Sequence, residues 1–108
     1  MNLIKQHIEQ ISQICLEHQV EQLFIFGSIA TDKFSDQSDV DILIQFSAQI
    51  NPLNYFDNYM DFKDSLEILF QRKVDLVEIQ TVKNPILKRS IDRNKIIIYG
   101  RTDTKMAV

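Results

Sequence analysis

The sequence predicts a single α/β domain with a mixed sheet and flanking helices. Apolar residues recur at helical or at alternating spacing, and these patterns follow in the order helix, strand, strand, helix, strand, helix, strand. With 108 residues, of which 44% are hydrophobic and 25% charged, the chain is long enough for one core. We therefore expect the domain to occupy residues 1–100, followed by a polar tail over residues 101–108.

The first helix is predicted from about Leu3 to His18. Its apolar positions form one stripe between Lys, Gln and Glu residues: Ile4, Ile8, Ile11, Ile14 and Cys15. Cys15 is the only cysteine, which excludes an internal disulfide, and its place on the stripe predicts a buried structural thiol. His7 and His18 have no second imidazole at metal-ligand spacing, so we expect both at the surface.

Two strand patterns follow this helix. Residues 22–26 are apolar and end at Gly27, and after a linker a second pattern alternates through Val40, Ile42, Ile44 and Phe46. Asp39 and Asp41 therefore share the side opposite to the core, with backbones roughly 6.6 Å apart. Asp is depleted in strands, so turn chemistry explains Asp36 in the linker but not these two carboxylates.

The step from Gly27 to Ser28 predicts an anion site beside these carboxylates. Gly27 has no Cβ and lets backbone N–H groups approach a ligand, and Ser28 offers a hydroxyl that can cap a helix beginning near Ile29. Carboxylate oxygens suit Mg²⁺. A phosphate-binding turn next to metal-binding carboxylates predicts a nucleoside triphosphate held through its phosphates and magnesium.

The second half of the chain predicts two helices and two strands. Asn-Pro pairs start helices over residues 51–71 and 84–94, and strands are expected over residues 73–79 and 95–99. The longer helix carries an apolar and aromatic stripe that we expect in the core: Tyr55, Phe56, Tyr59, Phe62, Leu66, Leu69 and Phe70.

Asp75 interrupts the third strand pattern and is a third carboxylate candidate. By alternation it lies with Val77 and Ile79, toward the covered side or the end of the neighbouring strand, and Glu78 lies on the opposite face. If the two carboxylate strands are neighbours, Asp75 completes a triad with the two earlier aspartates. The alternative is a solvated aspartate at a strand edge beside Lys73.

The overall charge argues against two classes of partner. A net charge of −3 and a pI near 5.2 do not suit a surface for broad nucleic-acid or anionic-membrane binding, so we expect neither a membrane nor a direct nucleic-acid partner. The apolar runs are too short to span a bilayer, and the N-terminus lacks the apolar core of a signal peptide. We expect a cytoplasmic protein.

The combined motifs resemble the polymerase-β-like nucleotidyltransferases, in particular the minimal nucleotidyltransferase (MNT) group. The resemblance covers nearly the whole chain and rests on Gly-Ser-x10-Asp-x-Asp, the Val-Asp-Leu-Val strand, the helix that begins Asn-Pro and the closing Ile-Ile-Ile-Tyr strand. It implies the polymerase-β-like fold and an ATP triphosphate held by Gly27 and Ser28. It also implies that Asp39 and Asp41 bind Mg²⁺, and that Asp75 completes the metal site or takes the proton from the attacking hydroxyl.

The resemblance further implies a function. Small stand-alone MNT proteins resemble antitoxins, protein adenylyltransferases that move AMP from ATP to a tyrosine of a cognate HEPN-domain ribonuclease toxin and silence it. Two alternatives stay open: an aminoglycoside-type nucleotidyltransferase, which usually needs an added helical domain, and an antitoxin that acts by binding alone. The family often has Ala-Arg-Gly where this chain has Ala30, Thr31 and Asp32, which removes a possible phosphate contact and favours some loss of activity.

Overall fold

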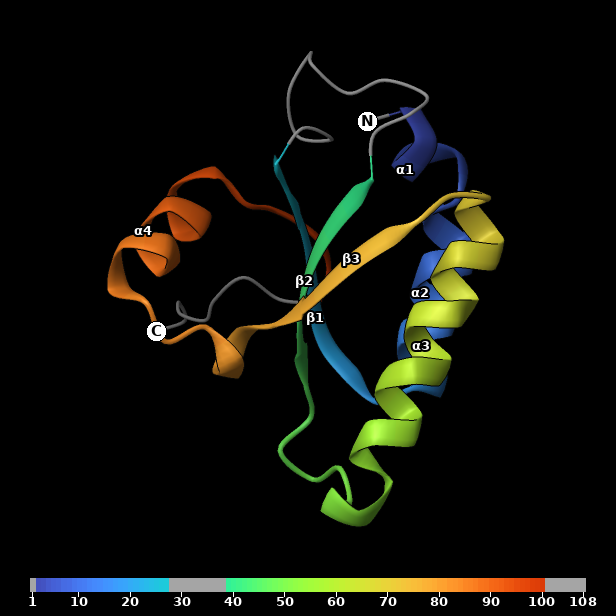
Figure 1. Ribbon diagram of the computed structural model, residues 1–108. Coiled ribbons are helices and arrows are strands. Elements are labelled where there is room, and N and C mark those ends of the chain that lie inside the picture. Colours follow the sequence, from blue (N-terminus) through green and yellow to red (C-terminus); the bar gives the residue numbers. More distant parts are fainter. Residues whose placement is uncertain (1, 28–38, 101–108) are drawn as a thin grey trace, which may run out of the picture.

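A computed structural model describes residues 2–27 and 39–100 of the chain. Within these residues four strands form one sheet in the order β3-β2-β1-β4 (Figure 1). The strands are β1 (Val20–Phe26), β2 (Val40–Phe46), β3 (Val74–Glu78) and β4 (Ile96–Tyr99). β1 runs antiparallel to β2 and β4, whereas β2 and β3 are parallel, so the predicted mixed sheet is confirmed.

Helices cover both faces of this sheet. α2 (Ile8–Glu17) and α3 (Tyr55–Phe70) lie on one face, and α4 (Pro85–Asn94) lies on the other (Figure 1). A short helix α1 (Asn2–Gln6) precedes α2, and the 3₁₀ turns η2 (Pro52–Asn54) and η3 (Ile79–Thr81) precede α3 and α4.

The predicted first helix is broken at His7. Its backbone leaves the helical region (φ −121°, ψ 18°). The imidazole Nδ1 donates to the Leu3 carbonyl at 2.9 Å, and the ring meets Phe70 edge-on at 5.9 Å. The helix is thus divided there into α1 and α2, and the His7 ring bridges α1 and the end of α3.

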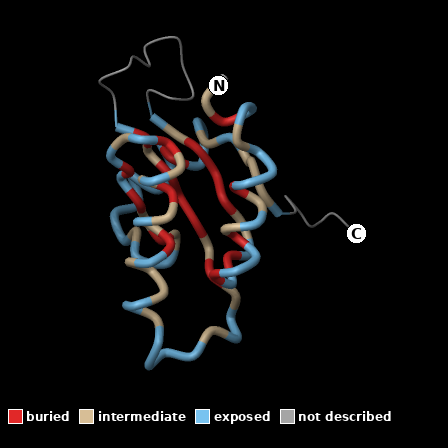
Figure 2. Tube along the Cα trace, turned by 90° about the vertical axis from the view of Figure 1, so that its right-hand side faces the viewer, coloured by how far each residue is buried: buried red, intermediate tan, exposed pale blue. Residues whose placement is uncertain are grey.

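The main core lies between the sheet and the pair α2 and α3. Figure 2 shows buried residues concentrated along the strands. The buried members of this core are Ile4, Ile11, Cys15, Val20, Leu23, Ile25, Val40, Ile42, Ile44, Phe46, Phe62, Leu66, Phe70, Val74 and Leu76. The predicted alternation of β2 is thus confirmed, and so is the burial of Cys15, which raises the pKa of its thiol to about 12.

The opposite face carries a smaller apolar cluster. Phe24 of β1, Leu43 of β2 and Ile91 of α4 are its buried members. The helix that covers this face begins at Pro85, and Asn84 caps it by accepting from the backbone N–H of Ile86 at 2.9 Å. The predicted start and end of this helix are confirmed, and α4 is what allows Leu43 to be buried on the carboxylate side of β2.

Two expectations about side chains are wrong. Phe56, expected in the core, is 71% exposed, because α3 turns its neighbours Tyr55 and Tyr59 toward the sheet instead. His18, expected at the surface, is only 7% exposed, and its Nε2 lies 2.6 Å from an Asp61 carboxylate oxygen on α3.

Other expectations concern segments outside the described residues. Ser28, the helix expected near Ile29, the turn residue Asp36 and the tail over 101–108 all lie there. Among the helices that the structure does describe, none has both the length and the apolar character needed to cross a membrane.

Candidate active site

Three strands bring the sequence-predicted residues to one end of the sheet. Asp41 of β2 is paired with Phe26, the last residue of β1 and the neighbour of Gly27, and on its other side with Asp75 of β3. Residues in register on adjacent strands point to the same face, and such strands lie roughly 4.8 Å apart. Asp41 and Asp75 therefore share the α4 side of the sheet, and the predicted adjacency of the two carboxylate strands is found.

Asp41 is the electrostatic centre of this group. Burial raises the pKa of its carboxyl group, and the negative charges of Asp75 and Asp39 raise it further. Asp41 also shares a hydrogen bond with Asp75. Burial and the charges of its neighbours thus disfavour the ionised form of Asp41.

Gly27 is held against this carboxyl group. Its φ of +71° lies in the left-handed region, and a Cβ built on it would collide with an Asp41 carboxylate oxygen. Both its conformation and its close approach to Asp41 therefore require glycine. The sequence singled out Gly27 for its access to phosphate, and the structure adds that it leaves room for Asp41.

The donor set fits a magnesium ion in its chemistry. Three carboxylates supply only hard oxygen atoms, and a divalent cation would relieve the repulsion that raises the pKa of Asp41. Over residues 2–27 and 39–100, however, no three His, Cys, Asp or Glu side chains already stand in a metal-binding arrangement. Asp41 and Asp75 meet directly, whereas Asp39 is exposed and acts on Asp41 through its charge.

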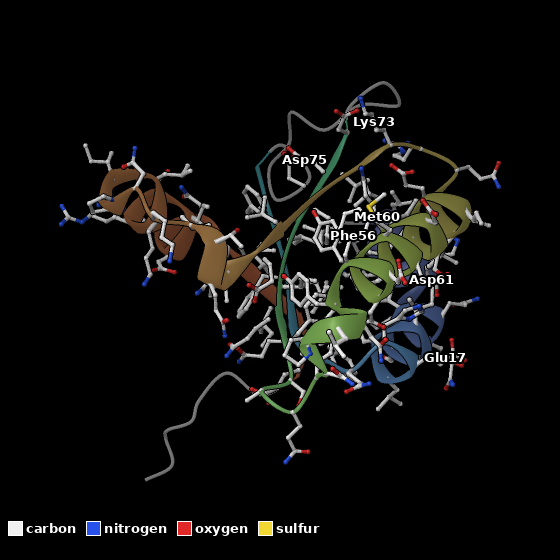
Figure 3. The ribbon with its side chains drawn as sticks, turned by 60° about the horizontal axis from the view of Figure 1, so that its bottom comes forward. Glu17, Phe56, Met60, Asp61, Lys73 and Asp75 are labelled. Carbon is white, nitrogen blue, oxygen red and sulfur yellow. The ribbon has the colours of Figure 1, made fainter. Side chains whose placement is uncertain are left out.

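Two side chains of α3 hold β3, the edge strand that carries Asp75. The Tyr59 hydroxyl donates to the Leu76 carbonyl, and Glu67 accepts from the Val74 backbone N–H at 2.9 Å. Burial raises the pKa of Tyr59, and so does the charge of Asp75. Asp75 itself projects from β3 away from α3 (Figure 3). Sequence reasoning placed Tyr59 only in the core and did not single out Glu67, because each bonds the backbone of a strand that comes later in the chain.

Comparison with known proteins identifies a family and a relative that this chain resembles. The family profile described as "Polymerase beta, Nucleotidyltransferase" matches residues 9–104. The Methanocaldococcus jannaschii protein named "Putative protein adenylyltransferase MJ0128" is 35% identical over 82 residues, which is 76% of this chain and 80% of that protein.

Two solved structures share the architecture. One, described as a putative minimal nucleotidyltransferase, has a TM-score of 0.70 and 26% identity, covering 86% of this chain and 90% of that one. The other, a complex of a tri-AMPylated Shewanella oneidensis HEPN toxin with an MNT antitoxin, has a TM-score of 0.63 and 14% identity over 90% of this chain and 72% of that chain. At that identity the second likeness shows the fold alone.

Proposed function

The chain belongs to the polymerase beta nucleotidyltransferase family and is a nucleotidyltransferase, and we propose that it moves AMP from ATP to a tyrosine hydroxyl of a cognate HEPN toxin, dependent on Mg²⁺. The observation that carries the proposal is Asp41, held between Gly27 and Asp75 with its pKa raised by burial and by the charges of Asp75 and Asp39. The relative named as a protein adenylyltransferase supports a protein as acceptor, and the resemblance of the motifs to the MNT group extends this to a toxin as partner.

The proposed transfer divides the work among these residues. Gly27 and Ser28 would hold the triphosphate, and Asp39 and Asp41 would hold Mg²⁺, with Asp75 as the third ligand or the base. The tyrosine oxygen attacks the α-phosphorus, the bond from this phosphorus to the β-phosphate oxygen breaks, and pyrophosphate leaves. The phenolic proton passes to Asp75. Bound Mg²⁺ would neutralise the charge that builds up on the phosphate oxygens.

The proposal includes a cellular setting. Modification of a toxin protein by ATP takes place in the cytoplasm, where we expect this chain. Its net charge of −3 favours a protein acceptor over direct binding of nucleic acid.

Intact-mass spectrometry of the protein encoded next to this chain tests the proposal. With Mg²⁺, ATP and a tenfold excess of that protein, the wild type adds AMP to it, on a tyrosine, and more than one copy is modified per copy of enzyme. Asp39→Asn and Asp41→Asn each lower the rate by at least about a hundredfold, since each removes a metal ligand. Circular dichroism confirms that the variants are folded.

Antitoxin action by binding alone predicts another outcome, and the missing Arg at Thr31 favours this second candidate. The neighbouring protein would keep its mass and would be silenced equally well by wild type and Asp41→Asn. That result would defeat the transferase proposal.

A further inference from the structure

The exposed aromatic residue Phe56 lines a groove beside β3. The groove has a volume of about 310 Å³ and lies between the first turns of α3 and the segment formed by β3 and η3. Its lining residues are Tyr55, Phe56, Tyr59, Leu76, Val77, Glu78 and Thr81. Just before it, Leu53 of η2 is 90% exposed. Exposed apolar side chains occur elsewhere on the surface too, so it is the combination of Phe56 with a groove that makes this place a candidate contact surface.

A second cavity adjoins this groove at Glu78. It measures about 380 Å³ and is enclosed by the end of β2, the loop before η2 and the end of β3. Tyr55 and Glu78 line both cavities, so we treat the two as one feature and call it the Tyr55–Glu78 groove. Within the second cavity Phe46 meets Tyr55 edge-on at 5.3 Å, and among the described residues that line it Glu78 is the only charged one.

Glu78 is an unusual residue for this position. It is 5% exposed, on the core face of β3, and burial raises the pKa of its carboxyl group. Its Oε1 accepts from the Gln80 backbone N–H at 3.2 Å and so caps η3. A neutral Gln, Asn or Ser could supply this capping bond without a buried charge. Hydrogen bonding from the Gln80 and Phe46 backbones lowers the pKa again and holds the carboxyl group at the cavity wall, where it adds a negative charge.

We propose that the Tyr55–Glu78 groove docks the protein acceptor, which places a basic side chain, Arg or Lys, in the Glu78 cavity and an apolar side chain against Phe56. The inference rests on the proposed function, because it assigns the surface that the modified protein contacts. A guanidinium or ammonium group would pair with the buried carboxylate and lie beside the two aromatic rings. Charge complementarity thus selects a basic partner segment over an acidic or purely apolar one.

The groove lies close enough to Asp75 for one acceptor protein to contact both. Glu78 is three residues beyond Asp75 on β3, a distance of roughly 10 Å along the strand. Asp75 and Glu78 point to opposite faces, so a partner reaches both by crossing β3, which is an edge strand of the described sheet. A partner whose tyrosine lies at Asp75 would then have its basic side chain about 10 Å away, within the same contact surface.

The first experiment tests the cavity without any acceptor protein. Nα-acetyl-arginine-methylamide is titrated into the isotope-labelled wild type, and NMR shifts are followed at Phe46 and Tyr55. We expect saturable shifts that disappear in Glu78→Gln, which keeps an acceptor for the η3 cap, and that are absent with the glutamine analogue of the probe. No saturable shift in the wild type, or equal shifts in Glu78→Gln, would overturn the assignment.

The second experiment uses the protein encoded next to this chain as acceptor. We expect Phe56→Ser and Glu78→Gln each to raise the KM for that protein at least about tenfold, with kcat and the affinity for MgATP unchanged. Ile68→Ser is the matched control, because Ile68 lies on the same helix, is 72% exposed and is not part of the groove. Equal KM values for Phe56→Ser and Ile68→Ser would overturn the proposal.

The two proposals fail in different ways. If the wild type modifies no protein, the transfer proposal fails, and calorimetry of the same proteins with the same variants still decides whether the groove is the contact surface. If transfer occurs but none of the groove variants changes KM, the docking proposal alone fails.

Discussion

The two faces of the sheet differ in how many side chains they bury and in whether they carry the site carboxylates. The face toward α2 and α3 is closed by fifteen buried residues, and its largest fully buried side chain is Phe62. The face toward α4 has three buried residues, Phe24, Leu43 and Ile91, and beside them Asp41 and Asp75 face outward on β2 and β3. The same two strands therefore contribute mainly apolar residues to the closed face, with Glu78 as the exception, and Asp41 and Asp75 to the other.

This difference shows how a small domain can place repelling charges on its sheet. The apolar face supplies the stabilisation, since burial of large side chains contributes about 1.5–3 kcal/mol each. The carboxylate face can then carry a group whose pKa is raised by its neighbours, which costs stability in the absence of a cation. Stability and chemistry are separated by the alternation of side chains along β2.

The largest expected effect of a single substitution is on the closed face. Phe62→Ala should lower the free energy of unfolding by about 3–5 kcal/mol, because Phe62 is 0% exposed and its loss leaves a cavity between α3 and the sheet. Ile91→Ala on α4 should cost only about 2 kcal/mol, since its cluster is small and close to solvent. Chemical denaturation measures both. Equal losses would mean that the two faces stabilise the fold alike.

Substitutions at Gly27 and Gly100 distinguish the effect of backbone strain on stability from an effect on nucleotide binding. Gly27→Ala should destabilise the protein by about 1–2 kcal/mol and also weaken MgATP binding, because the new methyl group displaces the Asp41 carboxylate. Gly100→Ala is the control: its φ is +93° and its Cβ would collide with the Glu21 carbonyl, far from the carboxylates. It should be destabilised comparably and bind MgATP normally. Normal MgATP binding by Gly27→Ala would show that Gly27 is not part of the nucleotide site.

The pH dependence of stability should reveal the strained carboxylate. Because the pKa of Asp41 is raised above its ordinary 3.8, the folded state holds this proton more tightly than the unfolded state. The stability that this proton contributes is fully present below pH 3.8, and it is lost as the pH rises through the raised pKa of Asp41. In buffer without divalent ions, the free energy of unfolding of the wild type relative to Asp41→Asn should therefore fall over this interval, and Asp41→Asn should be the more stable protein at about pH 7.

Glu78→Gln provides a second comparison for the pH dependence of stability. The pKa of Glu78 is also raised, by burial, so the wild type should lose stability relative to this variant as the pH rises above 4.5. Addition of Mg²⁺ should restore wild-type stability relative to Asp41→Asn but not relative to Glu78→Gln. A wild type that gains stability relative to both variants with rising pH would contradict the stated direction of the shifts.

The sequence was sufficient for the fold class and for the apolar side of β2. Alternation there placed Asp39 and Asp41 on the side opposite to the core, because that periodicity is a local property of a strand. In β3 it separated Asp75 from Glu78, but only the register with β2 shows that Asp75 joins Asp41. The order Asn-Pro likewise located the start of α4. The resemblance extended this to the polymerase-β-like fold, which the family profile and the solved structures confirm.

What the sequence could not supply depends on distant contacts. His18 was expected at the surface, but its Nδ1 bonds the Ile14 carbonyl and its Nε2 meets Asp61, 43 residues further along the chain. The exposure of Phe56 follows from how α3 is rotated against the sheet, which its mixed apolar pattern left open. The hydrogen bond between Asp41 and Asp75 required the parallel register of β2 and β3.

Isothermal titration calorimetry with ATP, in the presence and absence of Mg²⁺, tests most directly that the carboxylate face is the nucleotide and metal site. The wild type should bind ATP at least about tenfold more tightly with Mg²⁺ than without it. Folded Asp41→Asn should lose this magnesium-dependent gain, because its neutral amide replaces the carboxylate that would bind the cation. An equal magnesium-dependent gain in both proteins would contradict the account.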